Sequence, residues 1–276
     1  MVKRIRDHRR LFFSQLASLI DEATDANFPR LFASFLGEWV PAQEIVLFEF
    51  RKGLQPLVIF ASGGEKIDAD LRKYLSGLYL FDPFFETFQN TDKRGVLHIS
   101  QDSIENFNQS RFYQRYFRSL SAKNEVGSLL DVGQDICVHV SILIDDASTD
   151  QLERVVNVMG DIDHVCTSLF KMHYGSGPQG EIDEIELRRS VHAQIVKSLM
   201  SFGSRELTQR EKEIARFLLR GHSAKSMARL LDISPGTIGI HRSNIYKKMN
   251  VSSQAELSSL FLERLLHGGW AQSLAE

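Results

Sequence analysis

The sequence predicts an α+β protein in which an αβα sandwich comes first and a small all-α domain of four helices follows. Its 276 residues exceed what one ordinary domain needs, and 43% hydrophobic with 25% charged residues is typical of a soluble globular chain. Helical and strand-like patterns alternate up to about residue 174, whereas the remainder carries helical patterns only. Fifteen of the nineteen phenylalanines lie in residues 1–120, so the front domain must contain a substantial core.

The elements of the front domain follow from hydrophobic periodicity. Two amphipathic helices precede a strand hairpin that turns at Gly53, and adjacent late strands indicate an antiparallel sheet covered by helices. The expected helices span 4–24, 28–38, 66–77, 110–120 and 149–173, and the expected strands span 44–50, 56–60, 96–99, 124–132 and 135–144. We expect the aromatic stretch 79–85 to be a loop.

A glycine-rich breaker at 175–180 marks the boundary after the front domain. We therefore expect a sensor domain over 1–174, a linker with a helix over 175–203, and a terminal domain over 204–276. The linker helix has rough apolar periodicity. It could pair with a second copy of itself, with the front domain, or with neither.

Composition excludes several classes of protein. Two cysteines, Cys137 and Cys166, cannot form a disulfide framework, and no apolar run reaches the roughly 18 residues of a membrane span. The basic N-terminus lacks a signal-peptide cleavage site, so we expect a cytoplasmic protein without a membrane partner. We find no catalytic motif and no histidine–cysteine grouping with metal-ligand spacing. The sequence therefore predicts no enzyme, no cofactor and no metal.

Charge is unevenly distributed between the two ends. The last residues, from Arg205 on, carry a balance of +4, and residues 1–204 carry −6. A basic end on an acidic body favours contact of that end with nucleic acid.

Capping residues delimit the helices of the terminal domain. Thr208 and Glu211 form a capping box, Ser223 and Ser234 each begin a helix, and Pro235 occupies a first helical position. Two short helices separated by the tight turn at Asp232 are the arrangement of a helix-turn-helix unit. A fourth helix begins near Ser253.

The residues of this domain resemble those of the LuxR-type helix-turn-helix family of bacterial transcription regulators. The resemblance covers roughly residues 205–265 and rests on LTQREKEI at 207–214, GHSAKSMA at 221–228, ISPGTI at 233–238 and HRSNIYKKM at 241–249. It implies a regulator that binds double-stranded DNA as a homodimer. Gly239 departs from the pattern, because the family usually has lysine there.

Helical geometry divides the third helix of this domain into two sides. Ile238, Ile245 and Met249 should pack inward, so Arg242, Ser243 and Ile240 could reach base edges while lysines contact phosphates. The expected DNA-binding set is Lys225, Ser234, Thr237, Gly239, Ile240, Arg242, Ser243, Lys247 and Lys248. Alternatively, Lys225, Lys247 and Lys248 are solvent-exposed surface residues without a role in DNA binding.

The front domain suggests a sensor. Asp145 and Asp146 lie too late in the chain for a phosphorylated receiver, so we expect them to end a strand. Tyr74, Tyr79 and Asp82-Pro83 loosely resemble elements of the autoinducer-binding domains of LuxR quorum sensors, in which the aspartate accepts a hydrogen bond from the signal's amide. Asp70 stands where that family has tryptophan. The segment 107–117 is more similar to regulators with GAF-like sensor domains. Both comparisons imply a GAF/PAS-like αβα architecture.

We therefore expect Tyr74, Tyr79, Asp82 and Phe85 to line a pocket for a small-molecule signal, such as an acyl-homoserine lactone-like compound. The alternative is that the phenylalanines are ordinary core and that Asp82 caps a turn or helix. A sensor that binds a partner protein is the rival function. In the fourth helix of the terminal domain, we expect Leu260 and Phe261 to contact a second copy, while Leu257 packs within its own domain.

Overall fold

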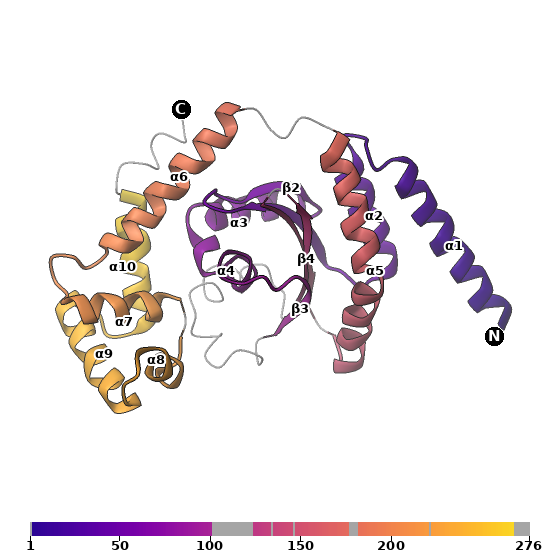
Figure 1. Cartoon of the computed structure of the whole chain (residues 1–276). Helices are drawn as coiled ribbons and strands as arrows, with labels where there is room; N and C mark the ends of the chain where they lie inside the picture. The colour runs from indigo at the N-terminus through magenta and orange to yellow at the C-terminus, as the bar shows by residue number, and fades with distance from the viewer. Residues whose placement is uncertain are drawn as a thin grey trace.

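The computed structural model describes residues 2–100, 124–133, 135–145, 147–176, 182–220 and 222–267. It confirms the predicted α+β class: a five-stranded antiparallel sheet with helices on both faces, followed by a helical terminal domain (Figure 1). The helix predicted at 110–120 lies outside the described residues. No helix of the described part of the chain is long and apolar enough to cross a membrane.

The sheet is the centre of the front domain. Its strands are β1 (Glu44–Arg51), β2 (Leu57–Ala61), β3 (Gly95–Ser100), β4 (Asn124–Gly133) and β5 (Ile136–Ile144). They lie in the order β2-β1-β5-β4-β3, and each neighbouring pair is antiparallel. Gly53, with a φ of 72°, forms the β1–β2 turn, a backbone conformation that glycine adopts at no steric cost. Asp145 directly follows β5, as expected of a strand end.

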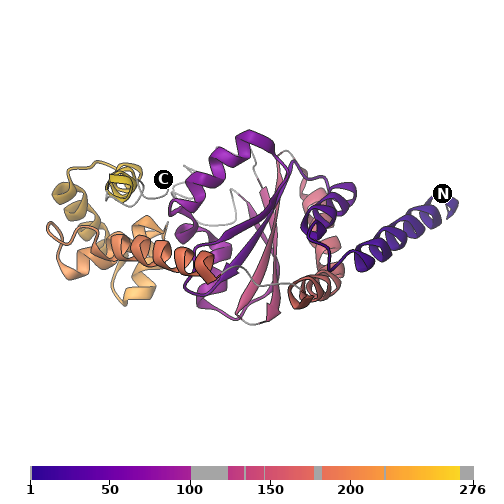
Figure 2. The same ribbon diagram turned by 90° about the horizontal axis from the view of Figure 1, so that it is seen from above.

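Two helices, α2 (Phe28–Trp39) and α5 (Thr149–Ser176), cover one face of the sheet, and α1 (Val2–Asp21) packs against α2. Phe28, Phe32 and Phe170 pack together beneath the strands, with ring centroids about 5–6 Å apart. The N-terminal part of α1 extends away from the body of the domain (Figure 2). Cys166 of α5 and Cys137 of β5 are both buried free thiols.

The opposite face carries α3 (Gly64–Leu75), the short 3-10 helix η1 (Leu78–Phe81) and α4 (Pro83–Asn90). The prediction of a loop at 79–85 is wrong, because η1 and α4 occupy this stretch. Asp82 caps α4 and Pro83 is its first residue, which are the positions that both residue types favour at a helix start. Phe81, Phe84, Phe85 and Phe88 are all buried, so they form the core of this layer.

The linker helix α6 (Ile182–Ser201) packs against the same layer of the front domain. Of the three arrangements predicted for this helix, the structure shows packing against the front domain. Val191, Ile195 and Leu199 are buried, and they belong to the apolar cluster that also contains residues of η1 and α4. This cluster continues into the terminal helices α7 (Gln209–Leu219), α8 (Ala224–Leu231), α9 (Pro235–Met249) and α10 (Gln254–His267). The two domains therefore share one continuous apolar core.

Candidate DNA-binding helix and sensor core

Helices α8 and α9 form a helix-turn-helix unit. Ser223 accepts the Ser226 amide and Ser234 accepts the Thr237 amide, so each helix begins at the predicted cap. Asp232 ends α8 with a φ of 51°, a left-handed conformation that aspartate tolerates better than most residues. The turn between the two helices thus spans Asp232, Ile233 and Ser234.

The inward side of α9 matches the prediction from helical spacing. Ile238, Ile245 and Met249 are buried, and they share their cluster with Met227 of α8 and Ile214 of α7. This packing fixes the orientation of α9 about its own axis. The packing of the buried side therefore determines which residues of α9 are exposed to solvent.

The outward side of α9 carries the residues that we expect at DNA. Ile240 is 64% exposed, and Arg242, Ser243 and Lys247 are exposed beside it. An exposed isoleucine of this size on a helix surface suits contact with a thymine methyl. A side chain added at Gly239 would meet nothing within 4 Å, so the packing does not require glycine there.

Three other predicted DNA residues already have partners within the protein. Lys248 donates to both carboxylate oxygens of Glu211, at 2.8 and 2.7 Å, and so ties the end of α9 to the start of α7. Burial opposes ionisation of Glu211, but the hydrogen bonds from Lys248 and Thr208 outweigh it and hold its pKa below the ordinary value. Ser234 and Thr237 bond to each other through their hydroxyls at 2.9 Å. Lys225 remains exposed.

In the front domain, Asp82 occupies a buried position between α4 and α3. Its Oδ1 accepts the Phe84 amide at 2.8 Å, and its Oδ2 accepts the Tyr74 hydroxyl at 2.6 Å. Burial raises the pKa of Asp82 to about 6; the charge of Glu125 adds to the rise, while His139 and the two hydrogen bonds oppose it. Asp82 is therefore the helix cap that the alternative interpretation predicts, and its contact with a signal stays a prediction.

Three residues that the sequence reasoning missed lie close to Asp82: His139, Glu125 and Ser141. The His139 side chain is fully buried, its Nε2 lies 3.5 Å from Glu125 Oε1, and its ring stacks on Phe84 at 4.4 Å. Ser141 donates to the same Glu125 oxygen. Charged and polar residues inside the apolar runs of β4 and β5 were the signal that could have revealed them.

The other two predicted pocket residues, Tyr79 and Phe85, have partners other than Asp82. The Tyr79 hydroxyl is 3.0 Å from His192 Nδ1 on α6, so this tyrosine faces the linker helix and not Asp82. Phe85 packs edge-on against Phe50 and Tyr79, with 5.1 Å between ring centroids in each pair. The structure thus joins Tyr74 to Asp82 and places Tyr79 and Phe85 in the adjoining core.

Two cavities among the described residues lie away from this core. One, of about 400 Å³, is lined by Ser198, Phe202, Arg205 and their neighbours between α6 and α10. The other, of about 280 Å³, lies between α1 and α2. Within the part of the chain that the structure describes, no three His, Cys, Asp or Glu residues are placed to hold a metal ion.

A sheet domain with a buried polar core is thus followed by a domain with an exposed helix-turn-helix unit, which is a DNA-binding motif. Residues 205–261 match the family described as "Bacterial regulatory proteins, luxR family". Residues 205–261 therefore form a helix-turn-helix domain of the LuxR family, as the residues of this segment predict.

Individual proteins agree with this assignment. A candidate HTH-type transcriptional regulator of Aeromonas salmonicida, from the exeN 3′ region, is 27% identical over 191 residues, which are 67% of this chain and 95% of that protein. The transcriptional regulatory protein UhpA of Escherichia coli is 38% identical over 64 residues, covering 23% of this chain and 30% of UhpA. The VqsR LBD domain of Pseudomonas aeruginosa has the same fold as the front domain, with a TM-score of 0.52 at 21% identity over 61% of this chain and 99% of that structure.

Proposed function

We propose that this protein is a cytoplasmic, dimeric regulator whose front domain senses a small molecule and thereby controls DNA binding by α9. The observation that carries the sensory half is the buried polar cluster of Tyr74, Asp82, Glu125 and His139. Burying carboxylates and an imidazole inside an apolar core is costly unless they are paired and hydrogen-bonded, and buried groups with perturbed ionisation gather at functional sites.

The cluster also constrains the kind of signal. Asp82 and Glu125 offer acceptor oxygens, which suit a ligand that donates hydrogen bonds through an amide, as an acyl-homoserine lactone-like compound does. Asp70, at the position of the family's tryptophan, is buried and forms an ion pair with Lys73 at 2.8 Å. The part of the signal that tryptophan would contact is therefore recognised differently, or the signal lacks it.

The DNA-binding half rests on the geometry of α9. We infer that Arg242, Ser243 and Ile240 contact base edges, because they are exposed on the side opposite the buried face. Lys225 and Lys247 would contact phosphates, and the start of α9 at Ser234 and Thr237 would lie against the backbone. Lys248 would contribute mainly by holding α9 on α7.

The test of the sensory half is mass spectrometry of small molecules retained by the purified chain. We expect one compound in near-stoichiometric amount from wild-type protein, and its loss from Asp82→Asn. Retention by the exposed-site control Asp92→Asn excludes a general effect of removing a carboxylate. Equal retention by all three proteins, or a compound that is absent from all of them, would contradict the proposal.

The rival function is a sensor that binds a partner protein. Leu11, Phe13 and Ile20 of α1 are about half exposed or more, and such apolar positions on a projecting helix favour protein contact. Replacing Phe13 and Ile20 with serine should leave small-molecule retention unchanged if the sensor is chemical. Loss of regulation by that variant in cells, with retention intact, would favour the protein partner.

A further inference from the structure

A cavity of about 400 Å³ lies where the linker helix ends and the terminal domain begins. The end of α6, the turn that follows it and α10 each contribute side chains to its lining. Small-molecule sites have volumes of roughly 300–1,000 Å³ and are often found between domains. The cavity therefore has the size and the location of a ligand site, and it shares no lining residue with the buried polar cluster around Asp82.

Gly203 determines the course of the turn that forms one side of this cavity. Its φ of 69° lies in the left-handed region, and a Cβ at this position would come within 2.6 Å of the Leu207 side chain. Leu207 is buried, and its amide donates to the Gly203 carbonyl at 2.8 Å. The chain thus leaves α6 in a defined turn, which places Arg205 and its two neighbours at the cavity.

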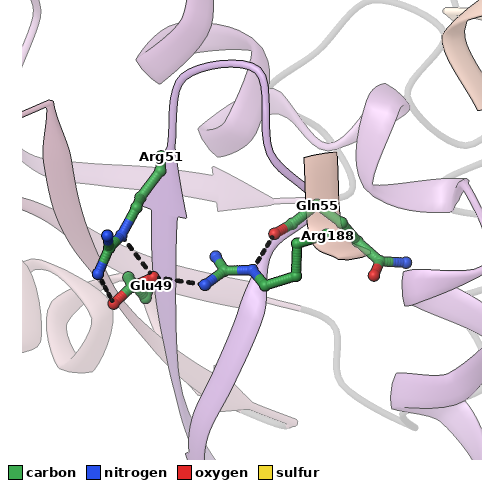
Figure 3. A network of polar contacts seen from close by, with 4 residues as sticks. All are labelled: Glu49, Arg51, Gln55 and Arg188. Carbon is green, nitrogen blue, oxygen red and sulfur yellow. Dashed lines mark hydrogen bonds and ion pairs between the residues drawn. The ribbon is translucent and has the colours of Figure 1, made fainter. Parts of the chain in front are cut away.

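The side formed by α6 is held in position by a buried ion-pair network near the start of that helix (Figure 3). Glu49 of β1 is 3% exposed and accepts hydrogen bonds from Arg51 at 2.9 and 3.0 Å and from Arg188 of α6 at 2.8 Å. Arg188 Nε also donates to the Gln55 carbonyl at 3.0 Å. Burial opposes the ionised form of Glu49, but the two arginines outweigh it and hold its pKa below the ordinary range. A cavity whose sides are fixed in this way loses little conformational freedom when it binds a ligand.

The charged groups at the cavity are mainly hydrogen-bond donors. Two arginines and one glutamate line it, which leaves a net charge of +1. Arg264 donates through one Nη to Glu206 at 3.0 Å, and its guanidinium lies over the Phe202 ring at 5.7 Å, a contact that orients the group. The other two nitrogens of Arg264 have no hydrogen-bond partner among the described residues, and Arg205 is exposed and pairs with none of them. Both guanidinium groups can therefore donate to an occupant of the cavity.

Hydroxyl groups and aromatic rings complete the lining. Ser201 donates to the Ser198 carbonyl at 3.2 Å, whereas within the described part of the chain the hydroxyls of Ser198 and Ser204 have no partner. Guanidinium and hydroxyl donors are the groups that bind carboxylate and phosphate oxygens. Phe202 and Phe261 give the same cavity an apolar side.

We propose that this cavity binds a small organic anion, whose carboxylate or phosphate oxygens accept hydrogen bonds from Arg205 and Arg264 and whose apolar part lies against Phe202. The site goes beyond the proposed function, because neither Asp82 nor α9 contributes to it. An occupant would contact α6, the turn and α10 at once. Because it binds the folded chain, it would also raise the stability of that chain.

The experiment titrates the full-length protein with benzoate and with phenyl phosphate, which represent the two kinds of anion. Benzyl alcohol is the matched probe without charge, and inorganic phosphate is the ion without a ring. Binding is measured by isothermal titration calorimetry at low salt, because salt screens charges near the surface, and by the change in melting temperature. The variant is Arg205→Gln, and the control is Arg189→Gln, which changes an exposed arginine of α6 that pairs with Glu186.

We expect at least one of the two organic anions to bind the wild-type chain and to raise its melting temperature. Benzyl alcohol should bind about tenfold more weakly or less, and Arg205→Gln should weaken binding of the anion by a similar factor, because each lacks a charge-assisted hydrogen bond. Arg189→Gln should bind like wild type. Ser204→Glu, which places a carboxylate at the cavity, should abolish binding of the anion.

Absence of binding of both organic anions to the wild-type chain would overturn the inference, whether or not inorganic phosphate binds. Equal affinity for benzyl alcohol would also overturn it, since charge would then have no role. The same holds for unchanged anion affinity in both Arg205→Gln and Ser204→Glu, because the anion would then bind elsewhere. None of these results bears on the proposed function, whose test is the compound retained through Asp82.

Discussion

Replacing Asp82 with asparagine should make the front domain more stable at neutral pH, not less. Asparagine has nearly the same shape, and its amide oxygen can accept the Phe84 amide, while its NH₂ can donate to a reoriented Tyr74 hydroxyl. The substitution removes a carboxylate, and burial disfavours the ionised form of this carboxylate. The polar contacts are therefore kept and the buried charge is lost.

The expected change in the free energy of unfolding follows from the pKa of Asp82. A rise from the ordinary 3.8 to about 6 means that ionising Asp82 inside the fold costs up to about 3 kcal/mol, at about 1.4 kcal/mol for each pKa unit. Because the folded pKa is the higher one, stability from this group is present below pH 3.8 and is lost as pH rises through about 6. Roughly half of the 3 kcal/mol should be lost between pH 5 and 7.5.

The assay is urea unfolding at several pH values in a Trp270→Phe background, which leaves Trp39 of α2 as the fluorescent reporter of the front domain. We expect the stability of Asp82→Asn relative to its parent to grow from pH 5 to pH 7.5 and then to level off. Asp92→Asn, at an exposed position, serves as the control. A pH-independent difference, or a larger loss at neutral than at acid pH, would refute the reasoning about buried charge.

Three further predictions concern the DNA-binding domain. Lys247→Ala should weaken binding to selected and random duplexes alike and lower the salt dependence of binding by about one counterion. Arg242→Ala should instead reduce the free-energy difference between the selected site and other sequences by about 1–3 kcal/mol. Equal losses of affinity on all sequences would show that Arg242 contacts only the DNA backbone. Gly239→Lys should stabilise α9 by about 0.5–1 kcal/mol and steepen the salt dependence, because nothing blocks a side chain there; unfolding or weaker binding would contradict this. Lys248→Met should destabilise the domain by about 1–2 kcal/mol, because it leaves the buried Glu211 without its ion pair. The control Lys247→Met should leave the stability of the domain unchanged. The same melting temperature for both variants would count against the contact between Lys248 and Glu211.

The sequence specifies the terminal domain well because its signals are local. Thr208 with Glu211, Ser223 and Ser234 each interact within three residues along the chain, so their geometry can be read from spacing alone. The same holds for the buried side of α9. The strands and most helices of the front domain likewise follow from short-range periodicity, and their predicted bounds agree closely with the structure.

The sensor core could not be predicted in this way because its partners are distant in sequence. His139 and Glu125 meet only through the pairing of β4 with β5, and Arg188 meets Glu49 only once α6 lies on the β1–β2 hairpin. The start of α4 is different, because Asp82 and Pro83 are a local signal for a helix start and the prediction of a loop at 79–85 did not use it.

The central claim is that α9 reads DNA through its exposed side, and selection from a random duplex pool tests it most directly. Wild-type chain and Arg242→Ala are incubated in parallel with the pool at low and physiological salt, and bound duplexes are sequenced. We predict that the wild-type chain enriches a near-palindromic site and that Arg242→Ala degrades the motif. Recovery of no motif by the wild-type chain, or binding that does not depend on salt, would contradict the account.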